Sequence, residues 1–241
     1  MVTDGEDGLA ADLVGSLVSV RSEVWRTVEP DSVVLHGQVS ITRDDKAGAL
    51  RAAAVAVDSL KAILSEFGGT ALSATTVRHK LTWSTQQIST QPEFNRAKQG
   101  GLTGRITANV AIRITIRDFT HLGELADLLA GNTSFELGYA AWDVDAENPA
   151  WSDLRADAIR GALRKGRDYA AALGASLVRV EHVADVGLLS GEDSGTMHQG
   201  QRFAAMAGSE GGSPSLDPVP QNLVARIEAR FRTTAVGLPP S

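Results

Sequence analysis

The stretch RITANVAIRITIR, residues 105–117, decides the fold, because apolar and polar residues alternate along almost its whole length. Its apolar face consists of Ile106, Ala108, Val110, Ile112, Ile114 and Ile116. Its polar face consists of Arg105, Thr107, Asn109, Arg113, Thr115 and Arg117. Alternation with a period of two over about a dozen positions predicts a β-strand with one buried face, and it is hard to reconcile with a helix.

The residues that follow predict a short helix, a strand over 135–144, a long helix and a strand over 177–186. Asn148 and Pro149 indicate where the long helix begins, because Asn caps free amide groups and Pro suits the first helical position. This helix is expected to run to Leu173. Small side chains recur at every fourth position on its predicted inner stripe, namely Ala158, Ala162, Gly166 and Ala170.

The flanking segments complete an α+β fold. They predict strands over 17–28 and 32–42, a helix ending near 67, a strand-like segment over 72–88 and a last strand over 223–233. The resulting order is ββαββαβαββ. We expect mixed, mainly antiparallel sheets with helices packed on them.

Residues 16–235 are expected to form one domain between a flexible N-terminal tail, 1–15, and a C-terminal tail, 236–241. If this domain has two lobes, the sequence favours a break near 91–101, which has the character of an exposed connection.

Residues 187–217 are rich in Gly, Ser, Glu and Pro, which is typical of a mobile loop. The apolar patch at 203–207 interrupts this polar character. Either it is a segment that docks on a protein partner, or it packs against its own domain.

Composition argues against several classes of protein. The 23 Lys and Arg residues against 29 Asp and Glu give a net charge of −6, which disfavours a general nucleic-acid binder. The chain has no Cys, so disulfides, cysteine nucleophiles and Cys-ligated metals are excluded. No stretch approaches the roughly 20 apolar residues of a membrane-spanning helix. The acidic N-terminus lacks the apolar region of a secretory signal, and this predicts a cytoplasmic location.

Several segments, in this order, resemble the SIMPL-domain family, also called the domain of unknown function 541. The similar segments are Val28–Leu35 with its Pro-Asp strand entry, Thr103–Val110, Arg117–Leu125, the helix with Ala at every fourth position before Leu173-Gly174, and the closing strand after Leu216-Asp217-Pro218. Together they cover most of 24–231. The chain departs from the family pattern at Arg105, where relatives carry Tyr, at Gly166, where they carry Ala, and in having no export signal.

The resemblance implies a non-enzymatic protein that forms oligomers or binds protein partners, and that has a loose link to oxidative-stress tolerance. It implies no catalytic residues and no cofactor. The expected partners are further copies of the chain and a protein bound through 187–217. The alternative is a small-molecule or anion binder, or an enzyme, with a pocket near the arginine faces or near Asp143 and Asp145.

Arginine faces are the main candidate site. Arg105, Arg113 and Arg117 share the polar face of one strand, and Arg226, Arg230 and Arg232 share that of the last strand. If these two strands are neighbours, the six side chains form a basic patch for a subunit contact or an anion. Pairing with acids from neighbouring elements is the more ordinary interpretation.

Two further groups of residues are candidates for a site. Asp143 and Asp145 share a strand face. Their carboxylates either take part in acid–base chemistry or metal binding, or they simply stabilise the start of the following helix. No two of the five histidines have the spacing of a metal site, and His182 is expected to be a satisfied core residue.

Overall fold

The computed structural model describes residues 15–76, 78–95, 101–188, 204–205 and 216–235. The chain divides into two compact units. Unit 1 consists of Met1–Val28, Ala146–Gly200 and Asn222–Ser241, and unit 2 consists of Glu29–Asp145 and Gln201–Gln221. The expected break near 91–101 is therefore wrong, because the strands on both sides of that range pair with each other within unit 2.

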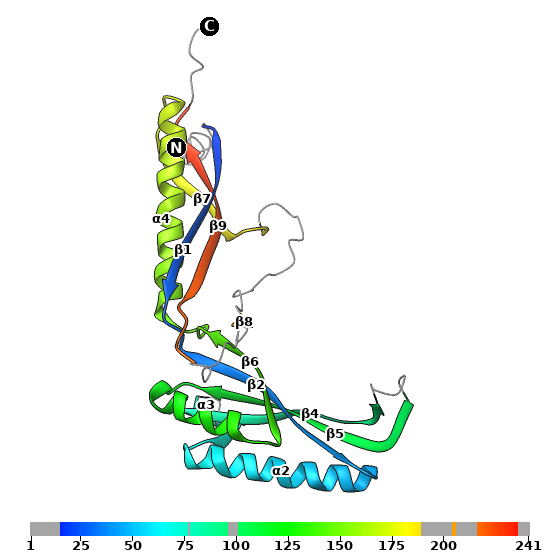
Figure 1. The fold of residues 1–241 in the computed structure, drawn as a ribbon. Coiled ribbons are helices and arrows are strands. Elements are labelled where there is room, and N and C mark those ends of the chain that lie inside the picture. Colours follow the sequence, from blue (N-terminus) through cyan, green and yellow to red (C-terminus); the bar gives the residue numbers. More distant parts are fainter. Residues whose placement is uncertain (1–14, 77, 96–100, 189–203, 206–215, 236–241) are drawn as a thin grey trace, which may run out of the picture. The chain divides into compact units, whose positions relative to one another are not determined.

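Unit 2 is built on a six-stranded sheet in the order β3-β4-β5-β2-β6-β8 (Figure 1). Its strands are β2 (Ser32–Arg43), β3 (Thr70–Ala71), β4 (Leu81–Asn95), β5 (Gly101–Ile116), β6 (Phe135–Asp143) and β8 (Ala204–Ala205). All neighbouring pairs are antiparallel except β3 and β4, which are parallel. The predicted alternation of β5 is confirmed, because its residues from Ala108 to Ile116 are buried at every second position.

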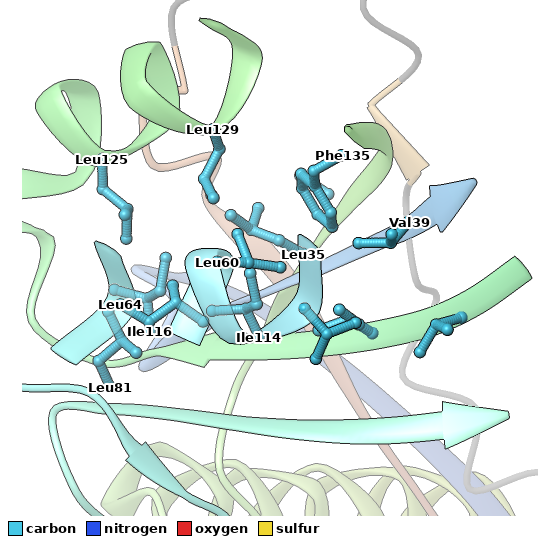
Figure 2. Packing of buried hydrophobic residues seen from close by; sticks show 14 of the residues in the cluster. Leu35, Val39, Leu60, Leu64, Leu81, Ile114, Ile116, Leu125, Leu129 and Phe135 are labelled. Atoms are coloured by element: carbon cyan, nitrogen blue, oxygen red, sulfur yellow. The ribbon is translucent and has the colours of Figure 1, made fainter. Parts of the chain in front are cut away.

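Helices α2 (Lys46–Glu66) and α3 (Leu122–Gly131) cover the apolar face of this sheet, and a short 3-10 turn, Phe119–His121, precedes α3. Figure 2 shows leucines of both helices converging on β2 and β5. The labelled residues include Leu60 and Leu64 of α2, Leu125 and Leu129 of α3, and Leu35 and Ile114 of the sheet, and all six are at most 1% exposed. The opposite face of the sheet carries the polar side chains.

Unit 1 is a three-stranded sheet, in the order β1-β9-β7, with one long helix. Its elements are β1 (Leu17–Val28), α4 (Pro149–Ala172), β7 (Leu177–Asp185) and β9 (Gln221–Thr233). The side chain of Asn148 accepts a hydrogen bond from the amide of Ala150, as the helix-start prediction requires. The predicted small stripe of α4, from Ala158 to Ala170, is buried at all four positions.

The predicted order of helices and strands is confirmed, and the structure adds two short strands, β3 and β8. Ala204 and Ala205 of β8 pair with Ala141 and Ala140 of β6, which favours packing of the apolar patch against its own unit. The predicted tails, except for Gly15, and most of the predicted loop over 187–217 lie outside the described residues. No helix in the described ranges has the length and apolar character needed to cross a membrane.

Candidate functional site

The six candidate arginines lie in two different sheets. Three of them, Arg105, Arg113 and Arg117, belong to β5 or directly follow it in unit 2, whereas Arg226, Arg230 and Arg232 belong to β9 in unit 1. Strand β5 lies between β4 and β2, and β9 lies between β1 and β7. The two strands are therefore not neighbours in a sheet, and the basic patch that depended on their pairing is not formed in that way.

Acids on neighbouring strands neutralise the arginine face of β9. Arg226 forms an ion pair with Glu23 of β1 at 3.0 Å, and Arg232 forms one with Glu181 of β7 at 2.8 Å. A third cross-strand pair runs in the opposite sense, from Arg21 of β1 to Glu228 of β9 at 2.8 Å. The polar face of unit 1 is thus a ladder of alternating charges, of which the Arg226–Glu23 pair is exposed and the other two pairs are partly buried.

The ion pairs of unit 1 lower the pKa of three carboxyl groups. The hydrogen bond from Arg226 lowers the pKa of Glu23. The pKa of Glu181 is lowered by Arg232 and, to a smaller extent, by Arg179. The pKa of Asp157 is lowered by Arg160. A carboxyl group whose pKa is lower in the folded than in the unfolded state stabilises the fold at pH values above its unfolded-state pKa, which is about 4.5 for Glu. This stabilisation is lost as the pH falls through the folded-state pKa.

We therefore expect the thermal unfolding midpoint to fall as the pH is lowered from about 5 to 3. Glu181→Gln should flatten this dependence, whereas Glu66→Gln on α2 should leave it unchanged. Circular dichroism melts at several pH values test the expectation. Equal acid sensitivity of the wild type and Glu181→Gln would contradict it.

The acids near the end of β6 stabilise local structure. Asp145 accepts a 2.7 Å hydrogen bond from Arg117, and its backbone amide donates to Asp31 at 2.8 Å. The exposed Asp143 accepts from the amide of Val144 at 3.0 Å. The geometry thus supports the structural interpretation of Asp143 and Asp145. Within the described residues no group of three or more His, Cys, Asp or Glu lies close enough to hold a metal ion.

His182 is exposed on β7, so its prediction as a core residue is wrong. The physical reason is that β7 is an edge strand, paired only with β9 among the described residues, and its valines Val178 and Val180 are also half exposed. Alternation identified the strand correctly but could not tell how well its faces are covered.

An extension of β4 and β5 beyond the rest of the sheet is the most exposed feature of unit 2. Strand β2 ends at Arg43, which pairs with Ile106, and beyond this point β5 pairs with β4 alone. We call this two-stranded extension, residues 93–95 and 101–105, the arm. Its strands change register, and Gly104 has a φ of +81°, a conformation that favours glycine. Figure 1 shows the hairpin curving at this end.

Polar contacts fix the base of the arm. The hydroxyl of Thr103 donates to the Glu93 carboxylate at 2.8 Å. Arg105 lies 3.5 Å from Asp44 and 3.8 Å from Glu93, and its guanidinium donates to the backbone carbonyl of Thr42 at 3.4 Å. Arg105 therefore links the arm to the end of β2.

Two apolar side chains lie at the tip of the described part of the arm. Phe94 of β4 is directly opposite Leu102 of β5, and they are 60% and 64% exposed. We call this pair the arm patch. The sequence prediction of an exposed connection over 91–101 missed it, although an aromatic residue and a leucine equally placed around Asn95–Gly101 are the signal of a cross-strand pair.

A shallow pocket of about 210 Å³ lies on the polar face of the six-stranded sheet. Its lining consists of His36, Gly37, Gln38, Ala111, Glu136, Gly138 and Tyr139. Arg113 is directly opposite His36 in the register, so one of the six candidate arginines borders a pocket. The rings of His36 and Tyr139 are stacked, with centroids 4.4 Å apart.

Comparison with known families agrees with this architecture, because residues 18–231 match the SIMPL model, whose description is protein of unknown function (DUF541). The chain belongs to the SIMPL family. The match spans strands of both units, from β1 to β9, so the SIMPL domain here comprises the two units together. No curated protein matches the chain. The description of the SIMPL family names no reaction, ligand or partner, so function has to be argued from the geometry.

Proposed function

We propose that this SIMPL protein acts without catalysis, by binding proteins, and that further copies of itself are among its partners. The arm patch carries the proposal. Phe94 and Leu102 expose most of their apolar surface on a two-stranded ribbon, beside which no third strand lies in the part of the chain that the structure describes. An isolated two-stranded hairpin is marginally stable in water, and exposed aromatic and aliphatic side chains at such a site favour a protein interface.

The outer edge of the arm favours the same function. On the side of β4 away from β5, strand β3 pairs with β4 only at Thr82 and Trp83, so within the described residues the rest of this outer edge has no neighbouring strand. An open edge presents backbone amides and carbonyls to another chain. Pro92 and the register shifts of β4 interrupt this edge, which favours side-chain contacts at the arm patch over long strand addition.

Among the six candidate arginines, Arg105 fits a subunit contact best. Its pairs with Asp44 and Glu93 are long and partly exposed. Because exposed pairs are weak, a carboxylate of a partner can replace them at little cost. Binding of a protein through 187–217 and a contribution to oxidative-stress tolerance are further parts of this proposal, and they rest on sequence composition and on the family resemblance.

Replacing both residues of the arm patch, Phe94→Ser with Leu102→Ser, is expected to weaken self-association at least about tenfold, because truncation of a central apolar anchor typically costs about 2 kcal/mol or more. Sedimentation velocity over a range of concentrations measures the effect. The matched control is Leu72→Ser with Leu128→Ser, two exposed leucines of unit 2 outside the arm. Equal masses for the wild type and the arm variant would overturn the assignment of the interface.

A further inference from the structure

The pocket on the polar face of the six-stranded sheet has walls of two kinds. The stacked rings of His36 and Tyr139 form one side, and Tyr139 is 48% exposed. Gln38 and Glu136 form the other side, joined by a 3.1 Å hydrogen bond. Ala111 and two glycines leave the floor open, since none of them has a side chain beyond Cβ. Ligand pockets for drug-sized molecules hold about 300–1,000 Å³, so a space of about 210 Å³ suits a single ring.

Arg113 is a neighbour, in the sheet, of two residues that line this pocket. It is directly opposite His36 across the β2–β5 pair, and it follows Ala111 by two positions on the same face of β5. On its other side it is opposite Ser84 of β4. A cation at this place can act on a ligand that lies over Ala111 and against the His36 ring.

No acid of the described chain neutralises Arg113. Its Nε atom is buried and has no hydrogen-bond partner. The nearby acids are engaged elsewhere, because Asp145 pairs with Arg117 and Glu136 accepts from Gln38. A half-buried guanidinium without a counter-charge is unfavourable, and its planar donors match a carboxylate.

Glu136 restricts the orientation of any anion in the pocket. Its carboxylate repels a negative group, so the anionic end of a ligand is favoured beside Arg113 and a hydrogen-bond donor is favoured beside Glu136. The ring between these two groups packs against the stacked pair of His36 and Tyr139.

We propose that this pocket binds a small aromatic carboxylate that carries a donor group opposite the carboxylate. Arg113 binds the carboxylate, the stacked pair of His36 and Tyr139 packs against the ring, and Glu136 accepts the hydrogen bond of the donor. The site is separate from the arm patch and does not depend on self-association.

Titration with 4-hydroxybenzoate tests the proposal, followed by the NMR shifts of the His36 and Tyr139 ring protons. We expect saturable shifts with a dissociation constant roughly in the micromolar to millimolar range, as suits a ligand of about ten non-hydrogen atoms. Arg113→Gln should weaken binding at least about tenfold, because a charge-assisted hydrogen bond is lost. Arg51→Gln removes the same charge from the exposed surface of α2, outside the pocket, and should leave binding unchanged.

Ala111→Leu provides a second variant that keeps Arg113 but fills the floor of the pocket, and it should abolish the saturable shifts. Benzoate, which has no donor for Glu136, should bind more weakly than 4-hydroxybenzoate. The proposal is overturned if the wild-type protein shows no saturable shifts or if Arg113→Gln binds with unchanged affinity. It is also overturned if inorganic phosphate displaces 4-hydroxybenzoate at equal concentration, because that result indicates a general anion site.

Discussion

Replacement of Ile114 by Ala is expected to lower the free energy of unfolding by about 2–5 kcal/mol. Ile114 is 0% exposed and lies at the centre of the helix-covered face of unit 2. It pairs with Leu35 on one side and with Trp83 on the other. Figure 2 shows Leu60 and Leu64 of α2 next to Ile114, so the space left by truncation is enclosed by neighbouring side chains.

Ile88→Ala is the matched control, because it removes the same atoms from the neighbouring strand β4 at a position that is 62% exposed. Its effect should stay near or below about 0.5 kcal/mol. Urea unfolding followed by circular dichroism measures both variants. Similar losses for Ile114→Ala and Ile88→Ala would contradict the described core.

Gly166→Ala is expected to destabilise unit 1 by about 1–3 kcal/mol, although Ala is the better helix former by about 1 kcal/mol. A Cβ atom at Gly166 would lie 2.8 Å and 3.0 Å from ring atoms of Phe231 on β9, and 3.3 Å from Leu177 on β7. Phe231 is only 1% exposed, so its ring has no free space into which to move. The added methyl group must push α4 away from the sheet.

The control for this substitution is Gly123→Ala on α3, where an added Cβ meets nothing within 4 Å. There the helix preference of Ala acts alone, and a gain of up to about 1 kcal/mol is expected. Thermal unfolding compares the two variants. Stabilisation by Gly166→Ala would show that α4 does not rest on Phe231 as described.

Local patterns predicted the individual elements because each depends on neighbouring residues. The alternation over 105–117 predicted β5 correctly, since helices cover one face of its sheet and leave the other polar. The Asn148-Pro149 pair predicted the start of α4, because a cap is made by residues within one turn. The small stripe of α4 likewise indicated a close approach, which Gly166 and Phe231 make.

The same local patterns could not predict which strands and side chains pair over long sequence separations. Glu23 and Arg226 are 203 residues apart, so alternating arginines on β9 revealed neither their partners nor the separation of β9 from β5. The division into units was missed for the same reason, because unit 1 is assembled from three distant segments. The pocket beside Arg113 requires six residues of β2 and β6 to meet Ala111 of β5, and only the register of the sheet determines this.

The arm is a candidate interaction site within a segment whose sequence predicts only an exposed connection. Its polar residues Thr103, Glu93 and Arg105 serve to fix a bend at Gly104. Phe94 and Leu102 are exposed at the end of the arm, and the proposed function depends on this exposure.

Sedimentation velocity of the unmodified chain over a hundredfold range of concentration tests the central claim most directly. Self-association predicts a mass that is a multiple of 25.4 kDa, or that rises toward one as the concentration increases. A constant mass of 25.4 kDa across the whole range would contradict the claim that copies of this chain bind one another.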